Sequence, residues 1–229
     1  MGDAQDLHDK IAAFHGKAMS DPHHRYRSWE HCYKFFRSRT RDALAADKNT
    51  AALHLGFYLA SWGMYRGSSF LLQRTYTIHA GIVECLLSPP FAELWQQDVG
   101  SEPADAHLIT RILELITAVK TAYEPHKASD ILATKVVLGT VGCLPAVDRF
   151  FIAGFRKSGR SYSSFNRPFV ERIMQFCNEY RADLGAEQSR IEAADGVYYP
   201  LMKLADMYFW QIGFEDAAAA AGGNSDLGE

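Results

Sequence analysis

Apolar residues recur every three or four positions along most of the chain, the spacing that places them on one face of an α-helix. Leu7, Ile11 and Phe14 follow it near the N-terminus, and Leu108 and Ile112 follow it in the middle of the chain. Strict alternation of apolar and polar residues, the pattern of a half-buried strand, is nearly absent. The sequence therefore predicts an all-α fold. The expected helices span residues 7–19, 29–45, 51–63, 70–87, 91–97, 104–123, 129–138, 146–155, 169–184, 188–194 and 201–214.

Proline, glycine and capping residues mark the breaks between these helices. Ser20-Asp21-Pro22 ends the first helix, and a glycine-rich loop is expected at residues 139–145. No internal repeat and no linker divides the chain. We therefore expect residues 1–216 to form one compact, two-lobed helical domain. Residues 217–229 are low in complexity and are expected to form a flexible tail.

Composition places the chain among ordinary globular proteins. It has 229 residues, of which 48% are hydrophobic and 22% are charged, and this excludes wholesale disorder. No stretch approaches the roughly 20 apolar residues that cross a bilayer, and the N-terminus lacks the pattern of a secretory signal. We expect a cytoplasmic protein with no membrane partner, no metal and no cofactor. The four cysteines, which lie far apart and in no metal-binding pattern, are Cys32, Cys85, Cys143 and Cys177.

The net charge of −3 hides an uneven distribution of charge. From residue 183 onward there are nine acidic and two basic side chains, so the preceding part of the chain is net positive. Six basic residues lie within 23–41 and six more within 149–172. Such segments would attract a polyanion if they shared one face of the molecule. The alternative is that they are solvated faces of two separate helices.

The segment from His126 to Phe151 combines an expected helix, a glycine loop and a second helix. The apolar run Leu144-Pro145-Ala146-Val147 leads directly to Asp148, with Arg149 beside it. Asp148 is therefore expected at a helix N-terminus, where the helix dipole favours a carboxylate. A simple capping role is the alternative to a role in chemistry.

This segment resembles the helix–hairpin–helix DNA glycosylases. In that superfamily a Pro-x-x-Asp or Pro-Val-Asp segment presents the catalytic aspartate at the start of a helix, and Pro145-Ala146-Val147-Asp148 matches it. The usual Leu-Pro-Gly-Val-Gly hairpin is replaced by Tyr123-Glu124-Pro125-His126-Lys127, and the four-cysteine cluster of some members is absent. The resemblance implies a helix–hairpin–helix glycosylase-like bundle with a cleft for double-stranded DNA.

The resemblance implies that Asp148 is the catalytic carboxylate. It would stabilise the positive charge that builds on the deoxyribose as the N-glycosidic bond breaks. Some members of the superfamily also carry a lysine that forms an imine with the sugar. Lys127 lies 21 residues before Asp148, close to the spacing between that lysine and the catalytic aspartate in those members. The alternative is that Lys127 is a solvated lysine in a loop.

An enzyme of this type needs aromatic residues around the flipped base and basic residues around the phosphates. Some of the candidates below also have a structural explanation. Tyr58 could be a core residue, Arg66 could form a surface salt bridge, and the loop at 157–164 could be a solvated connector. The candidate base-pocket residues are Tyr26, Trp29, Tyr58, Trp62 and Tyr65. The candidate DNA contacts are Arg66, Ser68, Lys135, Arg149, Arg156, Lys157 and Arg160.

Two functions follow from these residues. The first is a monomeric DNA glycosylase that leaves an abasic site, with Asp148 at the floor of a cleft edged by Arg66, Arg149 and Lys157. In general character, although by no single motif, the chain also resembles small bacterial phage-defence glycosylases that remove modified cytosines such as glucosylated hydroxymethylcytosine. The second is a non-catalytic helical module that binds DNA or a protein.

Overall fold

The computed structural model describes residues 2–103 and 105–223, and within these residues the chain forms helices and no strand. This confirms the prediction of an all-α fold. None of the helices in the described part is long and apolar enough to cross a bilayer. The α-helices are α1 (Gly2–Met19), α2 (Arg27–Arg37), α3 (Arg41–Ala46), α4 (Lys48–Ser61), α5 (Ala80–Leu86), α6 (Ala106–Thr121), α7 (Asp130–Thr140), α8 (Arg149–Lys157), α9 (Arg167–Glu179), α10 (Arg181–Asp195) and α11 (Leu201–Gly223). The short 3-10 helices are η1 (Phe70–Gln73), η2 (Tyr76–His79) and η3 (Pro89–Trp95).

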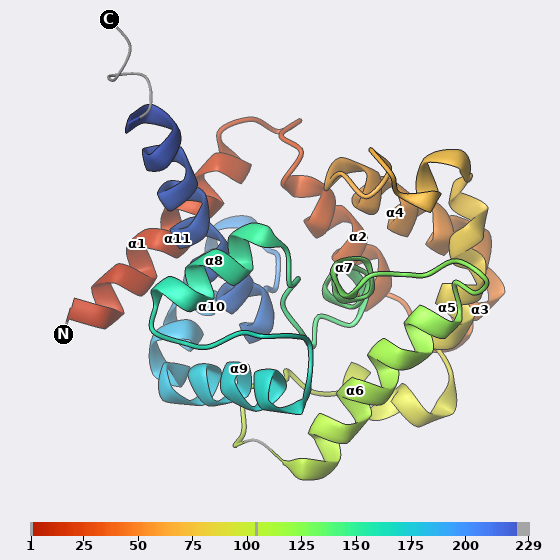
Figure 1. The fold of residues 1–229 in the computed structure, drawn as a ribbon. Coiled ribbons are helices and arrows are strands. Elements are labelled where there is room, and N and C mark those ends of the chain that lie inside the picture. Colours follow the sequence, from red (N-terminus) through yellow and green to blue (C-terminus); the bar gives the residue numbers. More distant parts are fainter. Residues whose placement is uncertain (1, 104, 224–229) are drawn as a thin grey trace, which may run out of the picture.

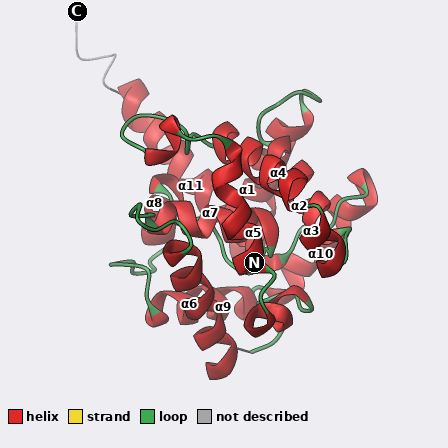
Figure 2. Ribbon diagram, turned by 90° about the vertical axis from the view of Figure 1, so that its right-hand side faces the viewer, coloured by secondary structure: helices red, strands yellow, loops and turns green. Residues whose placement is uncertain are grey.

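The buried faces of these helices meet in one continuous hydrophobic cluster that extends from Leu7 in α1 to Trp210 in α11. In Figure 1, α7 is seen end-on near the middle, with α1 and α8–α11 to its left, α3–α5 to its right and α6 running below it. α7 packs against α2, α4 and α6, and residues Leu132–Thr140 of it are all buried. Figure 2 shows the same helices, joined by loops, from a perpendicular direction. The helix that leads toward Asp148 is therefore anchored in the core.

α8 and α11 cross so closely that their backbones touch. A Cβ atom placed on Gly154 would lie 1.9 Å from the carbonyl oxygen of Phe209, and one on Gly213 would lie 2.0 Å from that of Phe150. These two contacts show that the helices run antiparallel. Only glycine leaves room for this approach, which fixes α8, and Asp148 at its start, against the C-terminal helix.

Several helix boundaries differ from the predicted ones because of local capping. The expected helix at 29–45 is interrupted after α2, and Thr40 caps α3 by accepting a hydrogen bond from the Ala43 N–H. The expected helix at 70–87 is divided into η1, η2 and α5. α11 continues through residues 217–223, which were expected to belong to a flexible tail, because its alanines are strong helix formers. Residues 224–229, the rest of that expected tail, lie outside the described residues.

Candidate active site around Asp148

Asp148 is the N-cap residue of α8, and its two carboxylate oxygens have different partners. Oδ1 accepts hydrogen bonds from the backbone N–H groups of Phe150 and Phe151, both at 3.1 Å. Oδ2 accepts a hydrogen bond from Nζ of Lys135 at 3.1 Å. The capping role considered from the sequence is thus real, and it occupies only one of the two oxygens.

The two residues before Asp148 are also held by side chains from the core. The backbone N–H of Ala146 donates to Oδ1 of Asp206 in α11 at 3.0 Å. The backbone N–H of Val147 donates to Oγ1 of Thr134 in α7 at 3.1 Å. Because α7 and α11 each hold part of this segment, the position of Asp148 is determined by tertiary structure as well as by its own helix.

Asp148 lines an open pocket of about 500 Å³. This volume is within the usual range for small-molecule sites. The wall comes from the end of α4 and the loop after it, the segment before α2, α7, the start of α8 and α11. The lining residues are Arg25, Ala60, Ser61, Trp62, Gly63, Met64, Arg66, Ile131, Asp148, Arg149, Phe150 and Trp210.

Three arginines of this pocket carry positive charge that no carboxylate neutralises. The side chain of Arg66 lies over Gly63, whose φ is +74°. A Cβ atom on Gly63 would lie 2.9 Å from Nε of Arg66. The Arg149 guanidinium lies 4.4 Å from the centre of the Phe150 ring. Among the described residues, neither of these arginines nor Arg25 forms an ion pair with a carboxylate. The pocket therefore offers three cationic groups to an anionic ligand.

Aromatic rings form the apolar part of the pocket. Trp62, Phe150 and Trp210 line it, and the ring centres of Phe150 and Trp210 are 5.1 Å apart. The Tyr26 ring stacks on Trp62 from the buried side, with their centres 5.0 Å apart. Burial raises the pKa of Tyr26, so its hydroxyl is protonated at neutral pH. A planar base would find stacking surfaces here.

Four of the predicted site residues line this pocket: Asp148, Arg66, Arg149 and Trp62. Tyr26 supports it from behind through its contact with Trp62. They come from two distant segments of the chain, one with Trp62 and Arg66 and one with Asp148 and Arg149, which the fold brings together. Their roles in binding or chemistry stay predictions.

Three aromatic residues predicted for the base pocket lie elsewhere in the structure. Trp29 and Tyr58 are 1% and 2% exposed. Tyr58 packs so closely on α7 that a Cβ atom on Gly139 would lie 2.4 Å from its ring. The Tyr65 hydroxyl is hydrogen-bonded to His79 Nε2 at 2.7 Å, and the ring packs against the core. None of the three lines the pocket, which corrects their expected placement: their apolar surface is used to pack helices.

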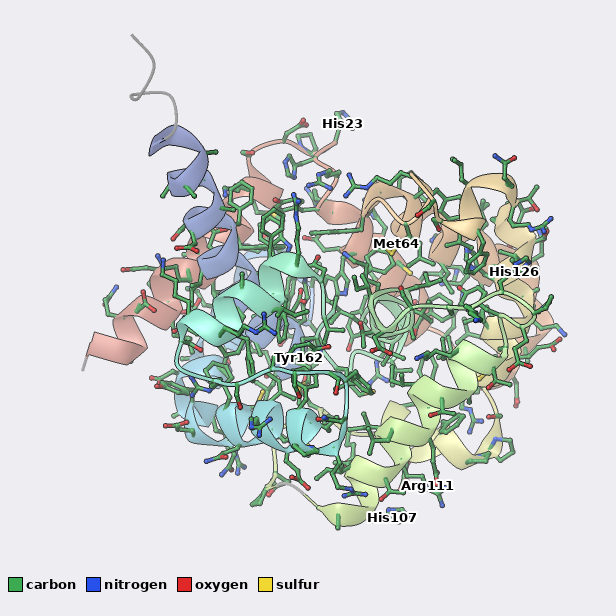
Figure 3. The ribbon with its side chains drawn as sticks, in the orientation of Figure 1. His23, Met64, His107, Arg111, His126 and Tyr162 are labelled. Carbon is green, nitrogen blue, oxygen red and sulfur yellow. The ribbon has the colours of Figure 1, made fainter. Side chains whose placement is uncertain are left out.

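Lys127 and Lys135 lie in environments that differ from the expected ones. Lys127 was predicted to act in the site, and Lys135 was predicted to contact DNA. Lys127 is exposed in the connector between α6 and α7 and does not line the pocket. In Figure 3 its neighbour His126 lies at the right-hand edge of the molecule, apart from Met64 of the pocket. Lys135, predicted to contact DNA, is 3% exposed and contacts Asp148 instead. Ser68 is exposed in the loop that carries Arg66 and is not a lining residue.

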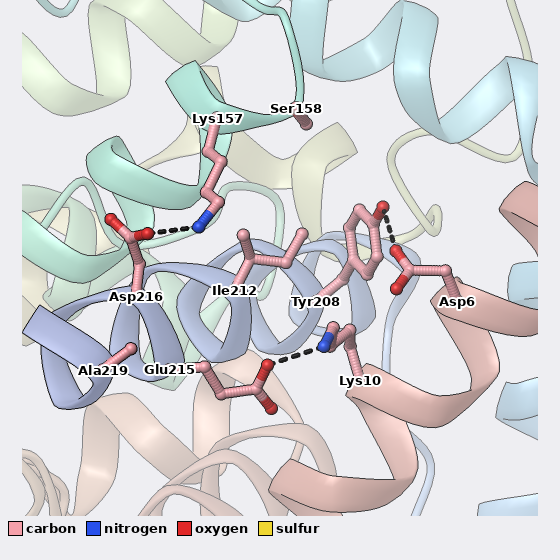
Figure 4. A pocket seen from close by; sticks show the side chains of 9 residues that line it. All are labelled: Asp6, Lys10, Lys157, Ser158, Tyr208, Ile212, Glu215, Asp216 and Ala219. Atoms are coloured by element: carbon pink, nitrogen blue, oxygen red, sulfur yellow. Dashed lines mark hydrogen bonds and ion pairs between the residues drawn. The ribbon is translucent and has the colours of Figure 1, made fainter. Parts of the chain in front are cut away.

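The predicted basic residues at the end of α8 and beyond have partners of their own. Lys157 forms an ion pair with Asp216 in a second pocket, between α1, α8 and α11 (Figure 4). Arg160 forms an ion pair with Glu179 at 3.2 Å. The Arg156 guanidinium donates two hydrogen bonds to one backbone carbonyl of the following loop. Lys157 was expected at the edge of the pocket of Asp148. It does not line that pocket, because it is paired with Asp216 of α11.

Other residues of the pocket were not singled out by sequence reasoning. Arg25 directly precedes Tyr26, a predicted base-pocket residue, and this adjacency was a usable signal. Phe150 and Trp210 look like ordinary core residues in the sequence, and only the crossing of α8 and α11 brings them to the pocket. The contact between Lys135 and Asp148 spans 13 residues and a loop, a separation that no local pattern predicts.

The described residues contain no group of three or more His, Cys, Asp or Glu side chains placed to hold a metal ion. Burial raises the pKa of Cys85 to about 11 and that of Cys143 to about 12, so neither is a thiolate at neutral pH. The polar chemistry of the pocket thus rests on one carboxylate and three guanidinium groups. Comparisons of the chain with protein-family models, with curated proteins and with solved structures found no match.

Proposed function

We propose that the protein is a DNA glycosylase whose active site is the pocket around Asp148. The observation that carries the proposal is the convergence on one pocket of aromatic walls, one capped carboxylate and three arginines that have no carboxylate partner in the described part of the chain. Arginines of this kind suit the phosphates of a DNA backbone. The aromatic walls suit a base that has left the helical stack. The carboxylate suits the sugar between them.

In this proposal the flipped nucleotide places its deoxyribose next to Asp148. As the bond between C1′ and the base nitrogen breaks, its electron pair leaves with the base and positive charge develops on the sugar. The carboxylate of Asp148 stabilises this charge. A water oxygen then bonds to C1′, and one water proton ends on the departing base. The products are a free base and an abasic site.

Two amines lie near the pocket wall, those of Lys135 and Lys203, whose Nζ atoms are 5.0 and 5.7 Å from the centre of the Trp62 ring, and both residues are buried. Lys203 pairs with Asp206 and does not line the pocket. Lys135 Nζ contacts Asp148, but the lysine side chain is only 4% exposed and does not line the pocket. Lys127 lies outside it. We therefore propose a monofunctional enzyme that uses water as the nucleophile. Treatment with borohydride during the reaction should trap no covalent protein–DNA adduct, and an adduct would contradict this part of the proposal.

For the substrate we propose a bulky modified base. A pocket of about 500 Å³ is of the size that holds drug-sized ligands, so it leaves room for a substituent on the base. Glucosylated hydroxymethylcytosine is the candidate, which would place the protein in defence against phages with such DNA. We propose that it acts as a monomer in the cytoplasm.

The test is base release from duplexes that carry cytosine, hydroxymethylcytosine, glucosylated hydroxymethylcytosine or uracil, detected as alkali-labile sites. Asp148→Asn should lower the rate by about 100-fold or more while DNA affinity is kept. Asparagine caps helices about as well as aspartate, so α8 should still begin at the same place.

Asp47→Asn is the matched control, because Asp47 caps α4 by accepting a hydrogen bond from the Thr50 N–H. It lies at the opposite end of α4 from the pocket, about 20 Å away along the helix. Its rate should equal that of the wild type.

A non-catalytic DNA-binding module is the second candidate, and the cap made by Oδ1 of Asp148 favours it, since capping alone explains an aspartate here. This candidate predicts DNA binding that Asp148→Asn leaves unchanged and no base release from any duplex. The same assay therefore separates the two functions.

A further inference from the structure

We propose that Lys135 is a positioning residue for Asp148: its buried ammonium group holds the carboxylate in the orientation that faces the sugar, without itself touching DNA. The inference rests on the proposed function and deepens it. The burial of Lys135 is unusual, since a lysine is seldom fully buried in a protein unless it is paired.

The cap at the start of α8 does not need the ion pair between Lys135 and Asp148. Capping of α8 is complete with the two hydrogen bonds to Oδ1 of Asp148. Asp47 and Asp105 cap α4 and α6 without any lysine at their carboxylates among the described residues. The ion pair with Lys135 is therefore an addition to the cap, at the oxygen that the cap leaves unused.

The surroundings of Lys135 leave it little freedom. Its side chain is 4% exposed, and Nζ lies 5.0 Å from the centre of the Trp62 ring, a contact that favours a cation. Taking two charges out of water is costly unless their geometry is good. The ammonium is thus fixed by Trp62 on one side and by Asp148 on the other. Fixed donors of this kind are how enzymes orient a reacting group before the substrate arrives.

Two effects of the ammonium on the reaction oppose each other. Its positive charge weakens the negative potential that Asp148 presents to the sugar. Its hydrogen bond prevents the side chain of Asp148 from turning away, and small displacements of a reacting group lower rates strongly. Lys135 does not line the pocket. In the proposed complex Asp148 therefore lies between Lys135 and the sugar, and we infer that orientation is the larger effect.

A second lysine with a carboxylate partner provides the control. Lys10 in α1 donates a hydrogen bond to Glu215 of α11 at 2.6 Å, and its side chain is 27% exposed. It lines the pocket between α1, α8 and α11 and not the pocket of Asp148. Lys10→Met therefore removes a lysine–carboxylate ion pair without altering Asp148 or the residues that hold it.

The experiment measures the single-turnover rate of base release and, separately, the affinity for the same DNA. Lys135→Met should lower the rate by about 100-fold, the effect of losing one preorganised charged donor. Affinity should stay within about twofold, since a buried group cannot contact phosphates. Lys135→Arg, which keeps the charge and the donor, should recover part of the rate, and Lys135→Gln, which keeps only a donor, should recover less. Lys10→Met should change the rate by less than about threefold, because it lies in another pocket and distant sites act independently.

The outcomes are distinct. A wild-type rate in both Lys135→Met and Lys135→Gln, on a duplex from which the wild type releases base, would overturn the inference and leave the proposed function intact. Equal losses of rate in Lys135→Met and Lys10→Met would also overturn it, because ion-pair loss alone would then explain the effect. A wild-type protein that releases no base from any duplex would overturn both proposals.

Discussion

At the scale of single residues, Asp148 shows what a sequence can and cannot predict. Its capping role follows from its place after Pro145 and before a run of helix formers, and the structure has that cap. Its second partner, Lys135, lies 13 residues earlier, and local patterns carry no information on which lysine turns inward. The same holds for Lys127, whose spacing to Asp148 fitted the resemblance but whose side chain is exposed.

His79 illustrates a residue whose importance only burial reveals. It is fully buried, with Nε2 hydrogen-bonded to the Tyr65 hydroxyl at 2.7 Å and Nδ1 to the Tyr123 hydroxyl at 2.8 Å. Burial lowers the pKa of His79 to about 4. Because the folded protein holds this ring neutral, its contribution to stability is present above pH 6.5, the ordinary value, and is lost as the pH falls toward 4.

The free energy of unfolding should therefore fall by about 2–3 kcal/mol between pH 7.5 and 4.5 on account of His79 alone. Urea unfolding at the two pH values measures this change. His79→Gln should be less stable than the wild type at pH 7.5 and should depend less on pH. His31→Gln, at an exposed position of α2, is the control and should keep the wild-type dependence. Equal pH dependence in His79→Gln and the wild type would contradict the assignment.

At the scale of elements, the glycines at the crossing of α8 and α11 matter most. Since a Cβ atom on Gly154 would lie 1.9 Å from a backbone carbonyl, Gly154→Ala has to push the two helices apart. We expect it to lower the free energy of unfolding by about 3 kcal/mol, the upper part of the range for overpacking. Urea unfolding of the purified variants measures this.

Gly185→Ala serves as the control, because a Cβ atom there meets nothing within 4 Å and the residue lies inside α10. It should raise the free energy of unfolding by about 0.5–1 kcal/mol. If Gly154→Ala were as stable as the wild type, the close crossing of α8 and α11 would be refuted.

The helical class could be predicted from the sequence because many of the helices bury an apolar stripe, as α1 does with Leu7, Ile11 and Phe14. Boundaries were harder to predict, since they depend on which polar residue captures a free backbone N–H. Thr40 does so at α3 and Asp148 does so at α8. The helix α8 therefore begins at Arg149, three residues after its predicted start at residue 146. Helix crossings could not be predicted, because nothing near Gly154 in the sequence indicates that Gly213 lies against it.

At the scale of the whole molecule, internal ion pairs sort the charges. Two acidic residues of α11 pair with basic residues of α1 and α8: Glu215 with Lys10 at 2.6 Å, and Asp216 with Lys157. Because Lys157 and Arg160 have acidic partners, the basic segment at 149–172 is not one unpaired patch. The arginines of the pocket come from residues 25, 66 and 149, and only the tertiary fold gathers them.

Affinity for duplex DNA should therefore depend steeply on salt. With three phosphate contacts, raising the salt from 50 to 200 mM should weaken binding about 40-fold. Arg66→Ala should reduce the slope of log affinity against log salt by about 1. Fluorescence anisotropy with a labelled duplex at several salt concentrations measures both quantities.

Arg181→Ala is the control, because Arg181 is paired with Glu102 at 3.3 Å on the acidic part of the molecule. Its slope should equal that of the wild type. An affinity that does not change with salt would rule out the arrangement of the three arginines as a phosphate site.

The mass of the DNA strand after incubation with the protein shows whether Asp148 catalyses release of a base. A duplex with one glucosylated hydroxymethylcytosine is the first substrate to use, followed by duplexes with the other bases. The account predicts a strand that has lost one base and gained one water, formed by the wild type and Asp47→Asn but not by Asp148→Asn. An unchanged strand mass with every duplex, or the same product from Asp148→Asn at the wild-type rate, would contradict it.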